Sequence, residues 1–529
     1  MKRLLLFLIC FCTLLFWSSC RNDFEFSPST GNLEFERDTV YLDTVFTNIG
    51  SSTYNLKVYN RSDEDIVIPT IQLEDGVTSL YRLNVDGTTG QEGAQEGKLF
   101  ENVELLANDS LFIFIETTID IASPDLGAAE NQFLYTDKIL FDSGSNQQEV
   151  DLVTLVKDAV FIFPERDADG IVETLTFDVD GDGSDDETTL QGRFLNEDEL
   201  TFTNEKPYVI YGYAGVGANQ TLTMEAGARV HFHRDSGILV TANGSLNING
   251  ELSPDQDTLE NEVILEGDRL EPIFSDVPGQ WGTIWLFDGS QNNSINYATI
   301  KNATIGIISD GNADVSNPKL EISNSQIYNA SSFGIRATGT SINAENLVIN
   351  NSGQSSFAGI FGGHYNFTHC TIANYWNSSF RQFPALLLND YVEDSNGMTF
   401  TNPLTQANFN NCIIYGNDNP ELFLDDRGEV FNYKFTNCLI RFNDANLEGT
   451  GNYVFDDNMF YEDNLFNADP DFEDPFENLM RIGDGSGANG LGSFSFTTAV
   501  PNDILNQQRP SSGENGPDSG AYESVSFED

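Results

Sequence analysis

A short phrase recurs along this chain every 22 to 42 residues, and it limits what the chain can fold into. Each copy places a small or apolar residue two positions before an isoleucine, and successive copies are 27, 22, 23, 42 and 26 residues apart. A repeat of this length cannot bury an apolar face alone, so neighbouring copies must stack into one continuous core. The aligned positions are Ala298, Ser325, Leu347, Cys370, Cys412 and Cys438.

The repeats carry strand patterns and no helical pattern. A second short segment of small and apolar residues follows the phrase, as at residues 305–308 and 357–360. The longest interval contains only one such segment, at residues 385–388, so we interpret it as one coil with an insertion. We expect each strand to pair in parallel with its equivalent in the next coil, which makes the six aligned positions one buried column.

The column explains the three cysteines that follow the N-terminal region. A free cysteine behaves as a small apolar residue, and the spacing of Cys370, Cys412 and Cys438 matches a stacking register better than a metal site or a disulfide. An asparagine ends several of the phrases, and asparagine tolerates the left-handed backbone of a tight bend. We therefore expect bends at Asn302, Asn329, Asn351 and Asn374.

Further phrases carry a resemblance to a known fold. Residues 225–232 and 279–285 look like the entry coils of exported β-helix proteins, and residues 518–523 (Asp-Ser-Gly-Ala-Tyr-Glu) look like their closing phrase. The chain thus resembles the right-handed parallel β-helix of the pectin-lyase-like class over residues 207–480. The resemblance implies architecture only, because the same fold hosts lyases, hydrolases, adhesins and inert scaffolds.

The N-terminal third has a different pattern. Apolar and polar residues alternate around Leu56, residues 111–115 form an apolar run, and turn residues separate short strands. This pattern predicts an antiparallel, immunoglobulin-like β-sandwich over residues 33–160. The complete fold class is therefore all-β, with an acidic connector at 161–206 and a C-terminal tail or cap at 481–529.

The first residues carry an export signal. Lys2 and Arg3 precede an apolar stretch that is shorter than the ~20 residues of a spanning helix. Small residues then precede Cys20, an arrangement that resembles the lipobox of bacterial lipoproteins. The resemblance implies a signal peptide at 1–19, a lipid on Cys20 and a tether at 20–32. The alternative is an ordinary signal peptide with an incidental cysteine.

Charge narrows the possible partners. The chain has 25 basic and 82 acidic residues, a net charge of −57. So negative a surface repels phosphate backbones, which argues against nucleic acid, and it repels acidic polysaccharides unless a metal ion bridges them. With the export signal, we expect a lipid-anchored protein of the outer membrane or cell surface of a Gram-negative bacterium.

An acidic loop in the connector is a candidate calcium site. Calcium takes about six to eight oxygen ligands, and carboxylates at alternating positions around a glycine turn can supply them from one loop. The loop looks like those of thrombospondin-type and dockerin-type repeats, and the alternative is a solvated linker. We expect a structural ion held by Asp178, Asp180, Asp182 and Asp186.

The insertion after Cys370 is a candidate binding face, because loops that interrupt regular repeats often carry function. Its aromatic and charged residues could stack on sugar rings, or the aromatic residues could cap an apolar seam. The candidate ligand-binding residues are Tyr375, Trp376, Arg381 and Asp390.

No catalytic motif is evident in the sequence. We therefore favour a non-catalytic protein that presents its β-helix for binding, most plausibly to carbohydrate. The alternatives are a polysaccharide lyase or glycoside hydrolase on the same scaffold, and a structural spacer.

Overall fold

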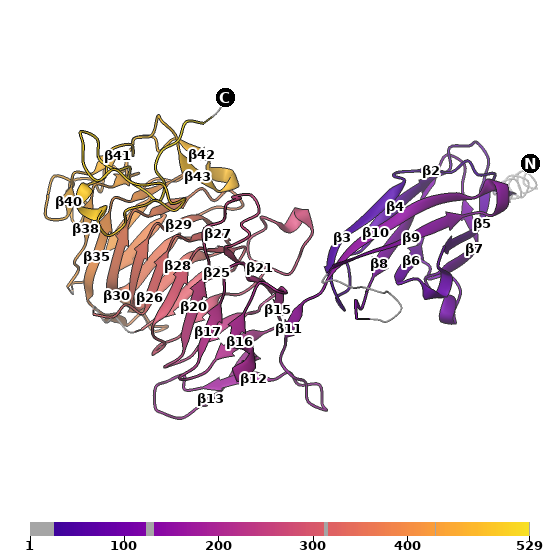
Figure 1. Ribbon diagram of the computed structural model, residues 1–529, viewed down its shortest axis with the longest axis horizontal. Coiled ribbons are helices and arrows are strands. Elements are labelled where there is room, and N and C mark those ends of the chain that lie inside the picture. The colour runs from indigo at the N-terminus through magenta and orange to yellow at the C-terminus, as the bar shows by residue number, and fades with distance from the viewer. Residues whose placement is uncertain (1–25, 123–131, 312–315, 429, 528–529) are drawn as a thin grey trace, which may run out of the picture. The chain divides into compact units, whose positions relative to one another are not determined.

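The computed structural model describes residues 26–122, 132–311, 316–428 and 430–527 (Figure 1). Cys20 and the expected signal peptide lie outside the described residues. The chain divides into two compact units, Met1–Asp158 and Ala159–Asp529. The described residues contain strands and short 3-10 turns but no α-helix, and so no helix among them is long and apolar enough to span a bilayer.

The first unit is a β-sandwich of two sheets around one core. One sheet has the order β2 (Glu34–Phe35), β4 (Tyr54–Tyr59), β8 (Ser110–Thr117) and β6 (Tyr81–Val85), with antiparallel pairing throughout. The other has the order β1 (Ser27–Pro28), β5 (Ile66–Leu73), β9 (Gln132–Phe141), β10 (Gln148–Lys157) and β3 (Thr39–Phe46), and β7 (Leu99–Leu105) also pairs with β5.

Alternate residues of both sheets build the core of this unit. Leu56 and Val58 of β4, Ile113 of β8, and Ile139 of β9 are fully buried and belong to one cluster. The expected sandwich is confirmed. Two of its strand pairs, β1 with β5 and β3 with β10, run parallel, which the alternation pattern alone does not reveal.

The second unit is a right-handed parallel β-helix. Its chain winds through successive coils, and equivalent strands of adjacent coils pair in parallel (Figure 1). One eleven-stranded sheet runs along it, made of β11 (Val160–Ile162), β15 (Tyr208–Ile210), β18 (Arg229–Phe232), β21 (Val263–Gly267), β24 (Ala298–Lys301), β27 (Gln326–Ala330), β29 (Val348–Ser352), β31 (Thr371–Asn374), β36 (Ile413–Gly416), β39 (Leu439–Ile440) and β41 (Leu465–Phe466).

The remaining strands of the coils join in an eighteen-stranded sheet, because β28 and β30 each continue through a corner. Its strands are β12 (Thr174–Phe177), β13 (Asp186–Phe194), β14 (Thr201–Phe202), β16 (Tyr213–Val216), β17 (Thr221–Met224), β19 (Gly237–Val240), β20 (Ser245–Asn249), β22 (Ile284–Leu286), β23 (Asn293–Asn296), β25 (Ile305–Asp310), β26 (Leu320–Ser323), β28 (Phe333–Glu345), β30 (Phe357–Thr368), β32 (Leu386–Asn389), β35 (Leu404–Asn410), β37 (Leu422–Asp425), β38 (Lys434–Thr436) and β40 (Tyr461–Glu462).

The expected column of small or apolar residues is present. The strand registers place each aligned position beside its equivalent in the next coil, and all six residues are fully buried. Cys370 and Cys412 are neighbours in this register despite the longer interval between them, so that interval is one coil with an insertion. The insertion contains the hairpin of β33 (Tyr391–Glu393) and β34 (Thr399–Thr401).

Left-handed bends flank the column on both sides. Asn302, Asn329 and Asn351 have φ values of 65°, 55° and 56°, as expected, and the Nδ2 of Asn351 donates to the Oδ1 of Asn329 at 2.6 Å. Asn374 differs, because it ends β31 in an extended backbone and its side chain bonds the backbone of Ser352. A second set of bends precedes the column at Tyr297, Asn324, Asn346, His369, Asn411 and Asn437.

The β-helix begins earlier than the repeat phrases indicate. Strand β11 pairs with β15 and so starts the eleven-stranded sheet at Val160, within the segment expected to be a connector. Strands β12 and β13 form an antiparallel hairpin in the same segment, and its Leu175 and Phe177 pack against Leu239 of β19. The acidic loop at the end of this hairpin therefore belongs to the β-helix unit.

Candidate functional site

The outer face of the eleven-stranded sheet changes character along the β-helix. Outward residues of β18, β21, β24 and β27 are mostly polar, whereas outward positions of β29, β31, β36 and β39 include the apolar residues Val348, Ala373, Ile413, Tyr415 and Leu439. On β24, for example, Ala298 and Ile300 point into the core and Thr299 and Lys301 point outward.

The C-terminal segment covers the apolar part of this face. Met480, of the hairpin formed by β42 (Phe472–Asp474) and β43 (Leu479–Ile482), joins Ile504 and Ala521 in a cluster with Val348 and Ala373. A second cluster packs Ile482 and Ala488 against Ile413, Tyr415 and Leu439. This burial explains why outward strand positions can be apolar here without facing water.

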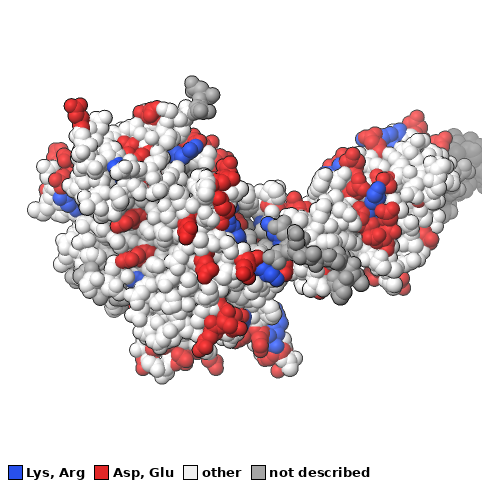
Figure 2. Space-filling model, in the orientation of Figure 1, with Lys and Arg blue, Asp and Glu red and all other residues white. Residues whose placement is uncertain are grey.

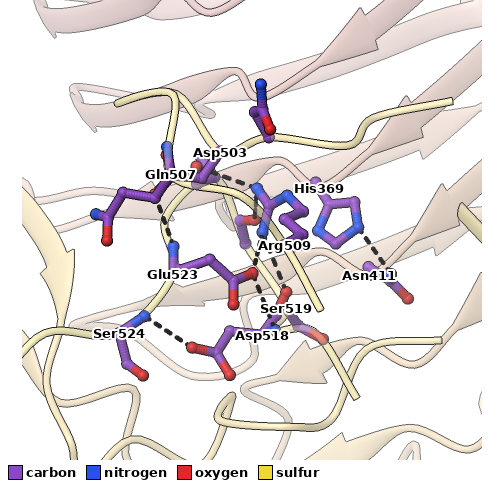
Figure 3. A network of polar contacts seen from close by, with 12 residues as sticks. His369, Asn411, Asp503, Gln507, Arg509, Asp518, Ser519, Glu523 and Ser524 are labelled. Carbon is purple, nitrogen blue, oxygen red and sulfur yellow. Dashed lines mark hydrogen bonds and ion pairs between the residues drawn. The ribbon is translucent and has the colours of Figure 1, made fainter. Parts of the chain in front are cut away.

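A polar network anchors the segment (Figure 3). The guanidinium of the fully buried Arg509 lies 2.7 Å from the carboxylate of Glu523 and donates to the Oδ1 of Asn346 at 2.9 Å. Asp503 accepts from the backbone N–H groups of Gln507 and Glu523 at 2.7 and 3.0 Å. Asp518 accepts from the backbone of Ser524 at 2.7 Å.

The closing phrase at residues 518–523 thus helps to hold the C-terminal segment on the β-helix. Glu523 belongs to it, and burial is the main reason that the pKa of this carboxyl rises to about 7, although the charge of Arg509 acts in the opposite direction. Burial, together with the positive charge of Arg509, holds the pKa of His369 well below its ordinary value. His369 is therefore neutral, and one of its ring nitrogens lies 2.9 Å from the amide of Asn411.

A groove of about 370 Å³ opens where the polar part of the sheet meets this segment. Gln326 and Tyr328 of β27 line its floor beside Lys301, and Arg481 and Tyr522 line it from the C-terminal segment. The Tyr522 hydroxyl lies 3.4 Å from the Oε1 of Gln326, and the Tyr328 hydroxyl also donates to that oxygen. The groove thus joins aromatic surface to amide and hydroxyl groups, the combination typical of small-ligand sites.

The basic groups of the groove are paired within the protein. The Nζ of Lys301 lies 2.9 Å from Glu266, and two nitrogens of Arg481 each lie 2.7 Å from an oxygen of Glu473. Burial raises the pKa of Glu266, but His231 and Lys301 outweigh it and bring this pKa below its ordinary value. Glu266 is therefore ionised and neutralises its basic neighbours.

A second carboxylate near the groove is held in a different way. Glu262 is buried and accepts from the hydroxyl of Thr299 at 3.0 Å, and burial raises its pKa. Glu262 and Glu266 are four strand positions apart, which corresponds to ~13 Å along a strand.

The candidate calcium residues come together in part. Carboxylate oxygens of Asp178, Asp180 and Asp186 lie within 4.8 Å of one another, the one group of three or more potential metal ligands found among the described residues. Asp182 is outside this group and accepts from the backbone of Ser184 at 2.8 Å. Asp178 also accepts from the N–H groups of Gly181 and Gly183, which shapes the loop. The clustered oxygens fit a hard cation such as Ca²⁺.

The candidate ligand-binding residues of the insertion make contacts within the protein. Trp376 is 7% exposed, and Arg381, 5% exposed, forms a buried ion pair with Glu421 at 2.6 Å. Asp390 is fully buried and accepts from the backbone N–H of Arg427 at 2.8 Å. Tyr375 packs edge-on against Phe472. These contacts tie the insertion to its surroundings and leave little of these four side chains for a ligand.

The groove was not predicted from the sequence. Its floor comes from outward positions within the repeats, while its wall comes from residues about 150 to 200 positions later. The alternation in residues 229–232, where Arg229 and His231 alternate with apolar residues, was the one available signal that the early coils carry a polar outer face.

The chain has little similarity to known proteins. No protein-family model matches the chain, and no curated protein matches it. Among solved structures, part of the chain is similar to a protein from the structural analysis of a family 123 glycoside hydrolase from Clostridium perfringens, with 9% identity and a TM-score of 0.16. The similarity covers 23% of this chain and 26% of that one, and at this TM-score it supports no argument about function.

Proposed function

We propose that this protein is an exported, lipid-anchored protein of the cell envelope whose β-helix binds carbohydrate without cleaving it. The observation that carries the proposal is the groove on the eleven-stranded sheet. It offers aromatic and amide groups on a rigid floor, and its basic groups are already paired with carboxylates. Such a surface suits the hydroxyl groups and apolar ring faces of an uncharged sugar.

Affinity electrophoresis through a panel of polysaccharides tests this proposal. We expect at least one polysaccharide to retard the protein, and we expect Gln326→Ala to reduce that retardation by about tenfold in affinity, as for a central contact residue. Gln406→Ala is the matched control, because Gln406 lies on β35 of the other sheet. Equal retardation of both variants and the unaltered protein would argue against the groove.

A second candidate is a lyase or hydrolase at the same place. Glu266, Lys301 and His231 lie together on the outer face of the sheet, and ionisable clusters beside a groove often belong to active sites. Incubation with the same polysaccharides, with and without calcium, distinguishes the candidates. If incubation releases new reducing or unsaturated ends, and Glu266→Gln abolishes their release, the protein is an enzyme. If a polysaccharide retards the protein but no such ends appear, the result supports binding without cleavage.

A structural calcium ion in the acidic loop is part of the proposal. Asp178, Asp180 and Asp186 would hold it, and Asp182 would need to turn inward to join them. The ion would fix the tip of the β12–β13 hairpin and would take no part in chemistry.

A further inference from the structure

The four-stranded sheet of the first unit carries aromatic rings on the face turned away from its core. Along β8, Ile113 and Ile115 are buried, whereas Phe112 and Phe114 are 42% and 40% exposed. The ring centroids of these two phenylalanines are 6.3 Å apart and their planes differ by 17°. The two nearly parallel rings form one exposed apolar strip.

The neighbouring strand widens this strip. Lys57 of β4 lies opposite Phe112, and its Nζ is 5.2 Å from the centroids of both Phe112 and Tyr59. The guanidinium carbon of Arg61 lies 4.1 Å from the centroid of the Tyr59 ring. A cation is attracted to a ring face, and Lys57 lies over rings of both strands, so Tyr59 of β4 extends the strip beside β8.

A cavity of about 490 Å³ adjoins the strip. The ring of Phe114 forms one side of it, and Arg82, Asn84 and Glu116 supply donors and acceptors around it. Gly93 and Gly97, both of positive φ, and Glu96 form another part of the lining. An aromatic wall beside a few convergent polar groups is the usual composition of a ligand site.

The charges of this face balance one another. Arg61 pairs with Glu34 at 3.2 Å, and Arg82 pairs with Glu116 at 3.9 Å. The chain as a whole carries a net charge of −57, whereas these basic and acidic groups offset one another locally. A neutral polymer would meet no net field here, whereas an acidic one would be repelled by the rest of the protein.

We propose that this face of the sandwich binds a neutral polysaccharide chain, with sugar rings stacked on Phe112 and Phe114 and hydroxyl groups bonded in the adjoining cavity. The site is independent of the groove in the β-helix, since it lies in the other unit. The protein would then hold glycan through a sandwich module as well as through its β-helix.

Affinity electrophoresis of the full chain in gels of neutral β-glucan, xylan and mannan, and of anionic alginate and polygalacturonate, tests the proposal. We expect a neutral gel to retard the protein, and we expect the double variant Phe112→Ala with Phe114→Ala to bind about tenfold more weakly. The matched control is Tyr41→Ala with Leu134→Ala, which removes residues 64% and 58% exposed on the other sheet. This control and Gln326→Ala should keep the part of the retardation that the sandwich provides.

Three outcomes would overturn the inference. They are no retardation by any neutral gel, retardation by anionic gels alone, and a Phe112/Phe114 variant that binds as the control does. Retardation that Gln326→Ala abolishes and the phenylalanine variant leaves unchanged would reject this site and retain the groove. Because a folding defect could imitate a loss of binding, Asn84→Ala serves as a second, polar variant, and thermal unfolding of each variant confirms that the sandwich is intact.

Discussion

Each residue of the β-helix interior packs against the equivalent residue of the adjacent coils. Phe367, Phe409, Phe435 and Tyr461 occupy equivalent positions, with successive ring centroids 5.1, 5.1 and 5.5 Å apart and planes within 20°. The small column at Cys370, Cys412 and Cys438 belongs to the same buried cluster. Large rings in one column are compatible with small thiols in another because the interior is narrow and closely packed.

This stacking predicts a large cost for removing a central ring. Phe409→Ala should lower the free energy of unfolding by about 3 to 5 kcal/mol, since it deletes a fully buried side chain with a ring on each side. Phe380→Ala is the matched control, because Phe380 is 85% exposed and its loss should change the stability little. Urea unfolding measures both, and similar effects of the two substitutions would contradict the stack.

A pH dependence follows from Glu523. Its pKa is raised to about 7 in the folded protein, mainly by burial, against ~4.3 in an unfolded chain. The folded state therefore binds the proton more tightly, so the stabilisation is complete below pH ~4 and is lost as the pH rises through about 7. Proteolysis of the C-terminal segment should accelerate between pH 5 and pH 8, and Glu523→Gln should flatten this increase. An unchanged pH profile in that variant would assign the effect to other groups.

At the scale of elements, the β12–β13 hairpin packs on one side of the β-helix. Its apolar residues Leu175 and Phe177 cover Leu239, while its tip presents the acidic cluster to solvent. Mutual repulsion of these carboxylates opposes the compact loop, and hydrogen bonds that they accept from the backbone N–H groups of Val179 and Gly181 act against this repulsion.

Calcium should therefore stabilise the β-helix unit. A ligand that binds only the folded state at a hundredfold excess over its Kd adds about 2.7 kcal/mol. We expect calcium to raise the melting temperature and Asp178→Asn with Asp180→Asn to abolish the increase. Asp394→Asn is the control, since Asp394 shapes an exposed turn of the same unit by accepting from the backbone of Asn396 and Met398. No change in melting temperature with calcium would favour the solvated-loop interpretation.

The elements differ in how far the sequence reveals them. The buried column could be predicted because each coil repeats the same contact, so six copies report one register. The β12–β13 hairpin could not be predicted, because its aspartates and glycines resemble those of a linker. Its packing depends on only a few apolar residues such as Phe177. The groove could not be predicted either, because two of its contacting residues, Tyr522 and Gln326, are 196 positions apart in the sequence. For Trp376 the sequence left two interpretations open, because an aromatic residue in an insertion can pack into the protein as readily as it can contact a ligand, and this side chain is largely buried.

At the scale of the whole molecule, the net charge is the dominant surface property. Acidic side chains outnumber basic ones on the face of both units that Figure 2 shows, as expected for a net charge of −57. A charge of this size opposes self-association and the approach of acidic polymers, while the two proposed glycan sites would use paired charges and ring faces. Their binding should consequently depend weakly on salt, unlike that of a site for a polyanion.

The lipid anchor is a prediction about the molecule in its cell. If Cys20 becomes the first residue of the mature protein, the protein should fractionate with membranes, incorporate labelled fatty acid and lack residues 1–19 by mass spectrometry. Cys20→Ala should shift it to the soluble exported fraction. A single acyl chain gives only reversible membrane binding, so stable fractionation requires more than one chain. Soluble, unlabelled protein that nonetheless lacks its first residues would indicate an ordinary signal peptide, and the glycan sites would then act on a secreted protein.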